Sequence, residues 1–105
     1  MKLASFCVPL SSQSDIAGNL STNGWTKLSN GLIIQWGKVI FDNPLNIQAY
    51  ITFPIPFPNS VLSASCTTMR NIPGENGYNH VGDVTNKGMT CVFDTIGGYW
   101  LAIGY

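Results

Sequence analysis

The side chains that could support catalysis are few and widely spaced in this chain. His80 is the single histidine, and the acids Asp42, Glu75, Asp83 and Asp94 are scattered over the second two thirds of the sequence. A hydrolytic triad needs a nucleophile, a histidine base and an acid that orients it, and glycoside cleavage needs paired carboxylates. Asp83 and Asp94 could supply an acid, but no motif marks a nucleophile. We therefore expect no catalytic residues and no enzymatic activity.

Cofactor chemistry finds no better support in the sequence. The three cysteines, Cys7, Cys66 and Cys91, form neither a CxxC pair nor a Cys/His pattern with zinc-ligand spacing. No glycine-rich loop precedes a helix that could cradle a phosphate. The sequence thus predicts no metal and no cofactor. Cys66 and Cys91 each fall on the apolar face of an alternating segment, where they are either buried thiols or the two halves of a cross-strand disulfide.

One irregular segment has a composition that suits ligand binding. The residues NGYNH at 76–80 place an aromatic ring among amides and an imidazole. Aromatic faces and amide groups together recognise the C–H surfaces and hydroxyls of sugars, and binding residues often lie on loops. The candidate receptor-binding residues are Arg70, Asn76, Tyr78, Asn79 and His80. An Asn-Gly turn with a packing tyrosine would give the same pattern, so both interpretations stay open.

Composition limits the partners. The chain has 105 residues, enough for one domain, and its formal net charge is zero with only 10% charged residues. The five basic residues are scattered, whereas nucleic-acid binding needs clustered Lys and Arg. Asn, Ser and Thr together number 27. The sequence therefore predicts no nucleic-acid partner, and a neutral surface of amides and hydroxyls suits an uncharged, polyhydroxylated ligand.

The stretch GWTKLSNGLIIQWG at 24–37 predicts a hairpin. Asn30-Gly31 is the preferred centre of a type I′ turn, between strands at Trp25–Leu28 and Leu32–Phe41. The second strand is apolar on both faces, so we expect it to be central or to face a partner chain. Gly37 predicts a bulge or a close backbone approach.

Further short strands follow at intervals of about 8–12 residues, which is typical of a sandwich or barrel. They are predicted at Ile47–Phe53, Val61–Met69, Met89–Phe93 and Tyr99–Tyr105, with Arg70–Gly82 irregular. Leu62, Ala64 and Cys66 are expected on one face. The segment FPIPFP at Phe53–Pro58 lacks three amide donors, so it must lie at an edge with Phe53, Ile55 and Phe57 in the core. The fold class is thus all-β, an antiparallel sandwich.

Residues 1–23 show no sustained periodicity and are predicted to be a linker, with a short helical turn at Gln13–Asn19. The opening residues MKLASFCVPLSS resemble a short signal peptide, but Pro9 interrupts the apolar run and no A-x-A site follows. No stretch is long enough to cross a membrane as a helix. We expect no membrane insertion.

Four segments occur in a characteristic order: GWTKLSNGLIIQWG, ITFPIPFPN at 51–59, the strand around Cys66, and the terminal YWLAIGY. Together they resemble the C-terminal domain of bacteriophage and prophage tail-fibre proteins of the gp53-like type, over residues 24–105. The resemblance implies a jelly-roll-like β-sandwich knob at the tip of a homotrimeric fibre, with residues 1–23 as linker or end of the shaft. It implies the scaffold positions Trp25, Gly31, Ile34, Trp36, Gly37, Phe53, Pro54, Phe57, Pro58, Ile103, Gly104 and Tyr105.

The same resemblance implies a function. Such knobs contact the bacterial surface, usually lipopolysaccharide or another glycan and sometimes an outer-membrane protein, and they bind without cleaving. The protein would then be part of a virion, made in the host cytoplasm. Two alternatives remain: a depolymerase tip that degrades surface polysaccharide, and a lectin-like or purely structural trimerisation module.

Overall fold

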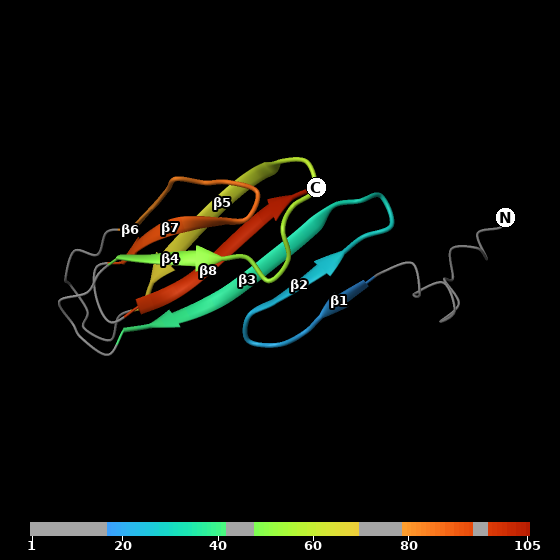
Figure 1. Ribbon diagram of the computed structural model, residues 1–105. Coiled ribbons are helices and arrows are strands. Elements are labelled where there is room, and N and C mark those ends of the chain that lie inside the picture. The colour runs from blue at the N-terminus through green and yellow to red at the C-terminus, as the bar shows by residue number, and fades with distance from the viewer. Residues whose placement is uncertain (1–16, 42–47, 70–78, 94–96) are drawn as a thin grey trace, which may run out of the picture.

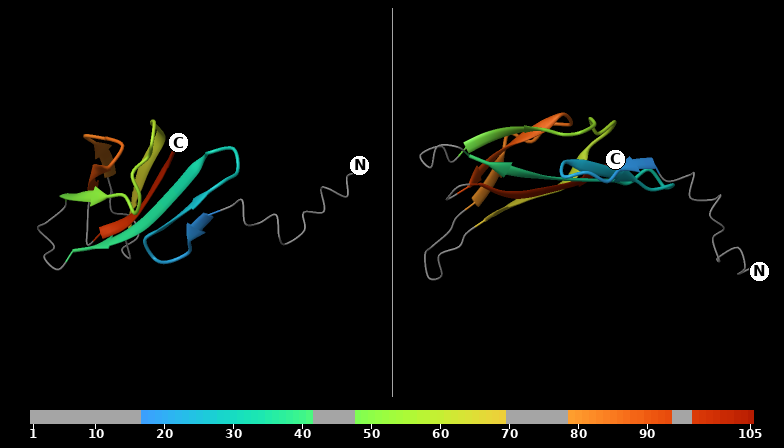
Figure 2. Two further views of the ribbon diagram at one scale, coloured as in Figure 1. Left: turned by 45° about the vertical axis from the view of Figure 1, so that its right-hand side comes forward. Right: turned by 90° about the horizontal axis from the view of Figure 1, so that it is seen from below.

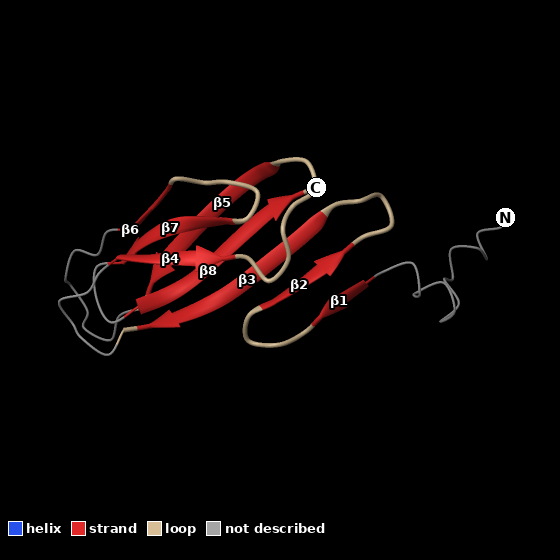
Figure 3. Ribbon diagram, in the orientation of Figure 1, coloured by secondary structure: helices blue, strands red, loops and turns tan. Residues whose placement is uncertain are grey.

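The computed structural model describes residues 17–41, 48–69, 79–93 and 97–105, and these form a β-sandwich. One sheet has five strands in the order β1-β2-β3-β8-β5, and the other has three in the order β4-β7-β6 (Figures 1 and 3). All neighbouring strands are antiparallel. The strands are β1 Ala17–Asn19, β2 Gly24–Lys27, β3 Ile33–Ile40, β4 Gln48–Thr52, β5 Val61–Thr68, β6 Asn79–Gly82, β7 Gly88–Phe93 and β8 Gly97–Gly104.

The core lies between the two sheets. Figure 2 shows the three-stranded sheet stacked over β3, β8 and β5, while β1 and β2 extend beyond it. Met89, Cys91 and Phe93 of β7 face this interior and are completely buried. They meet Ile33, Trp100 and Ala102 from the five-stranded sheet. Alternation in the sequence predicts that Ile47, Ala49, Ile51 and Phe53 face inward on one strand and that Met89, Cys91 and Phe93 share a face on another. The structure confirms the second set and, in the first, Ala49, Ile51 and Phe53, whereas Ile47 lies outside the described residues.

β3 and β8 form the centre of the five-stranded sheet and pair over their whole length, from Ile33 with Gly104 to Ile40 with Gly97. On β3 the buried positions alternate with partly exposed ones. The prediction of a central strand that is apolar on both faces is therefore confirmed. One face packs on the core, and the other carries Ile34, Trp36 and Ile40 to the outside of the sandwich.

The hairpin between β2 and β3 exists, but its predicted turn type is wrong. A type I′ turn needs positive φ at both central residues, whereas Gly31 has φ 96° and Asn30 is not in the left-handed region. The Gly31 N–H donates to Leu28 O at 2.9 Å, and the Leu28 N–H donates to Leu32 O at 2.8 Å. The Asn30 side chain instead accepts the Leu32 N–H at 3.0 Å. The loop is thus one residue longer than predicted, and Gly31 alone takes the left-handed conformation.

The proline-rich segment after β4 is held against the core by one buried amide. Gln35 on β3 is fully buried. Its Nε2 donates to Ile55 O at 2.9 Å, and its Oε1 accepts the Ile55 N–H at 3.0 Å. Phe53 and Phe57 on either side are buried in edge-to-face contact, 5.2 Å between ring centroids. The predicted anchoring of Phe53 and Phe57 is confirmed, and Ile55 is partly buried against the same core.

Three local predictions are corrected by the structure. Leu62 does not share the inward face with Ala64 and Cys66: it is 61% exposed, because the β5–β8 register shifts between Val61 and Ser63. The predicted irregular segment ends earlier, since residues 79–82 form β6 along β7. The predicted helical turn is wrong over residues 17–19, which pair with β2 as β1.

Gly37 marks a close approach to the β3 backbone, but the approaching groups are side chains and there is no bulge. A Cβ at this position would collide with the Trp100 indole and with Asn23 Oδ1. The β3–β8 pairing runs past Gly37 without a shift in register. The glycine is needed here because the Trp100 ring lies directly against the β3 backbone.

The scaffold positions implied by the resemblance occupy different environments. Gly37, Phe53, Phe57 and Gly104 are buried, Trp25, Gly31, Ile34, Trp36 and Ile103 are half-buried, and Pro54, Pro58 and Tyr105 are exposed. Their role as scaffold stays a prediction, as does the division of the chain at residue 24. No helix among the described residues is long and apolar enough to span a membrane.

Candidate functional site

Two of the five candidate receptor-binding residues are described by the structure, and both lie at the start of β6. Asn79 and His80 are its first two residues, and both are exposed. Arg70, Asn76 and Tyr78 lie outside the described residues. His80 sits beside Val92 of β7, which in turn pairs with Gln48 of β4. The structure therefore places His80 on the outward face of the three-stranded sheet, in one row with Val92 and Gln48.

The outer face of the three-stranded sheet, formed by Gln48, Tyr50, Thr52, His80, Thr90 and Val92, is mostly polar. Tyr50 is more than half exposed and pairs with Thr90. The Thr90 hydroxyl donates to Asp83 Oδ2 at 3.4 Å. Asp83 occupies the left-handed conformation with φ 48° after β6. This face thus presents an aromatic ring with hydroxyl and carboxylate groups beside it.

The outer face of the five-stranded sheet is largely apolar along its two central strands. β3 and β8 contribute Ile34, Trp36, Lys38, Ile40, Tyr99, Leu101 and Ile103 to it, and β5 adds the exposed polar residues Ser63, Ser65 and Thr67 beside them. Cross-strand pairs set Ile34 beside Ile103 and Trp36 beside Leu101. Lys38 lies over the Tyr99 ring, with Nζ 5.9 Å from its centroid. Ile40, Tyr99 and Leu101 are 54%, 52% and 41% exposed.

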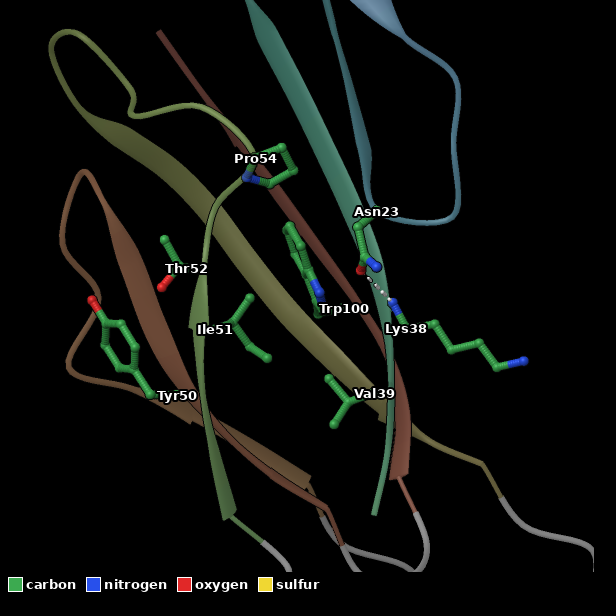
Figure 4. Close-up of a pocket in the computed structure, with 8 residues that line it drawn as sticks. All are labelled: Asn23, Lys38, Val39, Tyr50, Ile51, Thr52, Pro54 and Trp100. Carbon is green, nitrogen blue, oxygen red and sulfur yellow. Dashed lines mark hydrogen bonds between the residues drawn. The ribbon is translucent and has the colours of Figure 1, made fainter. Parts of the chain in front are cut away.

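A groove of about 270 Å³ opens between β3 and β4. Figure 4 shows the side chains of Ile51 and Val39 directed into it, with Trp100 between them. The side chains of Lys38, Tyr50 and Thr52 point away from it in the same view. Asn23, from the turn between β1 and β2, closes one side by accepting the Lys38 N–H at 3.1 Å on its Oδ1. Pro54 lies at the other end.

Two thiols meet in the core rather than at a surface. Cys66 on β5 and Cys91 on β7 are free and buried, so the reading as buried thiols holds for both. The Cys66 thiol lies 3.2 Å from His80 O, which can accept its hydrogen. Burial raises the pKa of the Cys91 thiol to about 12, and the adjacent Cys66 adds to this shift. Burial also raises the pKa of Cys66. Both thiols are therefore protonated and unreactive near neutral pH.

The described residues contain no group of three or more His, Cys, Asp or Glu side chains that could hold a metal ion. Asp83 is described, whereas Asp42, Glu75 and Asp94 lie outside the described residues. Asp83 is not among the residues that line the groove. The geometry thus offers surfaces for binding, with no described pair of carboxylates at the groove.

Sequence patterns missed the residues that shape the groove. In the sequence, Asn23-Gly24 indicates only a turn, and Trp100 is predicted only as a core residue. Gln35 was missed as well, although a polar residue in the middle of the run IIQW is a signal for a buried amide with a specific partner. Nothing in the local sequence links Asn23, Gly37 and Trp100, because only the fold brings them together.

Comparison with known proteins identifies the family. Residues 27–105 match the family of tail fiber protein gp53-like, C-terminal domains. The chain therefore belongs to this family, and its fold is that of R-type pyocin tail fibres.

Two solved structures and one curated protein illustrate the relationship. The R2 pyocin fibre of P. aeruginosa, C-terminal residues 323–691, superposes with a TM-score of 0.74 and 28% identity, covering 86% of this chain and 26% of that one. An N-truncated R1-type pyocin tail fibre gives a TM-score of 0.69 and 26% identity, covering 93% and 97%. An uncharacterised protein of Methanocaldococcus jannaschii, MJ0347, is 34% identical over 95 residues, covering 79% of this chain and 63% of that protein. The chain thus spans less than two thirds of that relative and about a quarter of the R2 fibre.

Proposed function

We propose that this protein is the receptor-binding tip of a phage or phage-like tail fibre. In this role it forms a homotrimer on the virion and binds a bacterial surface glycan, such as lipopolysaccharide, or an outer-membrane receptor, without cleaving it. The observation that carries the proposal is the family match over residues 27–105, together with the superposition on pyocin fibres. Both the matching family and the superposed structures are named as tail fibres.

The outer face of the five-stranded sheet supports the assembly. Soluble monomers rarely expose large contiguous apolar patches, yet this face carries Ile40, Tyr99 and Leu101 in exposed positions. Residue pairs across β3 and β8 make the patch continuous. Contact between copies of the chain through this face would bury it, and closed rings of identical subunits are the usual result of such contacts.

The opposite side of the molecule supports a polar receptor. His80 is exposed on the outer face of the three-stranded sheet, and Asn79, also exposed, precedes it at the end of β6, where it pairs with the inward-facing Phe93. Together with Arg70, Asn76 and Tyr78 they are our candidate receptor-binding residues. Amides, an imidazole and aromatic rings bind sugar hydroxyls and C–H surfaces. A receptor rich in hydroxyl groups therefore fits this side better than an anionic polymer.

The proposal is tested by mass and by binding. Light scattering on the purified chain should give the mass of three copies of the 11.4 kDa chain. Fluorescently labelled protein should bind a subset of a panel of bacterial strains, and incubation with extracted envelope polysaccharide should release no reducing sugar. A monomeric mass combined with no binding to any strain or extract would overturn the proposal. Release of reducing sugar would favour a depolymerase instead.

A further inference from the structure

The groove between β3 and β4 lies between two free strand edges. In the described structure β4 pairs only with β7. β3 is paired with β2 no further than Trp36, so residues 37–40 have no strand partner on that side among the described residues. An open strand edge presents N–H and C=O groups that seek partners. Backbone N–H and C=O groups therefore form part of the groove walls, including at residues whose side chains point away from the groove.

The direction of these backbone groups follows from the pairing. The Phe53 N–H donates across to Lys87 O at 2.9 Å, on the β7 side. Neighbouring residues of an antiparallel strand direct their backbone groups to opposite sides, so those of Tyr50 and Thr52 point toward the groove. The Lys38 N–H faces it as well, because it donates to Asn23 Oδ1. This explains why Lys38, Tyr50 and Thr52 line the groove although their side chains leave it.

Trp100 is the unusual member of the site. It is only 3% exposed, yet its indole N–H has no hydrogen-bond acceptor among the described residues. Buried tryptophan N–H groups usually find a partner, and an unsatisfied donor is unfavourable. Trp36 shows the normal case, because its Nε1–H donates to Ser21 O at 3.0 Å. The Trp100 N–H is therefore a buried donor without an acceptor among residues 17–41, 48–69, 79–93 and 97–105, which fits a site where a ligand supplies the acceptor.

Gly37 allows this donor and Asn23 to lie directly against the β3 backbone. A Cβ at Gly37 would collide with Trp100 Nε1 and with Asn23 Oδ1, so any larger residue would push both polar atoms out of place. Asn23 Oδ1 already accepts the Lys38 N–H, which leaves the Asn23 amide N–H groups as donors. The groove therefore offers donors from two side chains and apolar walls from Val39 and Ile51.

Size and charge narrow the ligand class. A volume of about 270 Å³ is at the small end of ligand sites. It suits one ring rather than a long chain. Lys38 is the only charged residue among the eight that line the groove, and its side chain points away. A neutral ring with several oxygen acceptors satisfies these conditions, and a sugar has this chemistry.

We propose that the groove between β3 and β4 is a saccharide subsite, in which the Trp100 N–H and the Asn23 amide donate hydrogen bonds to oxygens of one sugar ring. The proposal rests on the receptor-binding function proposed above. It adds a second place where the protein contacts the glycan, away from the residues at the start of β6. The free backbone groups of β4 supply the remaining hydrogen bonds.

Titration of the intact chain by ¹H–¹⁵N NMR tests the site directly. The three tryptophans, Trp25, Trp36 and Trp100, give three indole N–H signals, which Trp→Phe variants assign. Glucose, galactose, mannose and N-acetylglucosamine are the probes, with glycerol as the control. We expect a saturable shift of the Trp100 signal with at least one sugar, and no comparable shift of the other two. Short peptides are a second control. Equal shifts of all three signals, no shift, or a shift that only the peptides cause would overturn the subsite.

A binding assay on cells separates this inference from the proposed function. Trp100→Phe removes the donor and keeps an aromatic ring, and Trp25→Phe is the matched control outside the groove. Loss of one neutral hydrogen bond should weaken cell binding roughly threefold to tenfold in Trp100→Phe, while Trp25→Phe binds as the unaltered protein does. Circular dichroism confirms that both variants fold. If Trp100→Phe does not fold, Asn23→Ala replaces it in the same comparison.

The outcomes are distinct. Strong cell binding that neither groove variant weakens overturns the subsite and leaves the receptor-binding function intact. A sugar-dependent shift of Trp100 in a protein that binds no cells supports the subsite and overturns the receptor-binding function.

Discussion

The two outer faces of the sandwich differ in chemistry although both belong to regular antiparallel sheets. Across the five-stranded sheet, Ile34 pairs with Ile103 and Trp36 with Leu101. Across the three-stranded sheet, Tyr50 pairs with Thr90 and Gln48 with Val92. A sheet with one solvated face normally alternates apolar and polar residues. The three-stranded sheet follows this rule, and so does β5 of the other sheet, with Ser63, Ser65 and Thr67 outward. β3 and β8 do not follow it, which is the reason for proposing that this part of the face contacts another copy of the chain.

The largest effect should come from a charge on the apolar face. Leu101→Lys places an ammonium in the proposed subunit contact, where an unpaired buried charge is strongly unfavourable. We expect the mass measured by light scattering to fall threefold. Gln48→Lys introduces the same charge on the outer face of the three-stranded sheet and should leave the mass unchanged. If both variants keep the trimer, the apolar face is not the contact.

A second variant contrasts an inner with an outer glutamine. Gln35→Leu leaves the buried Ile55 N–H and C=O without partners. We expect the free energy of unfolding to fall by about 2–4 kcal/mol in urea titrations. Gln48→Leu, on the exposed face, should change it by less than about 0.5 kcal/mol. Similar values for the two variants would show that the Gln35 pair does not anchor residues 53–58.

The buried Cys91 thiol should make the free energy of unfolding depend on pH in the alkaline range. The pKa of Cys91 is about 12 in the folded protein, above its ordinary value of 9.0. Above pH 9 the unfolded chain therefore loses a proton that the folded chain keeps, and the free energy of unfolding falls as pH rises toward 12. The slope from this thiol is at most about 1.4 kcal/mol per pH unit. Urea titrations from pH 8 to pH 10 should show it, and Cys91→Ala should have a smaller slope. Equal slopes in both proteins would contradict the assignment.

The smallest expected effect is on binding to bacteria, from substitutions at the start of β6. Asn79→Ala and His80→Ala should each weaken binding to bacteria roughly threefold to tenfold, as expected for one hydrogen bond. Thermal unfolding should change little, because both side chains are exposed. Asn19→Ala, which removes an exposed amide on β1 in the other sheet, is the control and should bind normally. Undiminished binding of both variants would move the receptor site away from the start of β6.

The sequence by itself determined the fold class, most strands and the family. Alternation along 47–53 and 89–93 located the core because side chains of a strand point alternately to its two faces. The ordered segments around Gly24–Gly37 and the C-terminus identified the tail-fibre domain, now matched over residues 27–105.

Local pattern could not predict what depends on register and on distant contacts. Leu62 moved to the outside because a shift in the β5–β8 register reverses the alternation. The turn after Leu28 gained a residue because the Asn30 side chain took a backbone donor. The groove exists only because the fold sets Asn23, Gly37 and Trp100 side by side, although they come from three separate parts of the chain. Tertiary structure decided these features, since they arise from contacts between strands rather than from the residues of any one strand.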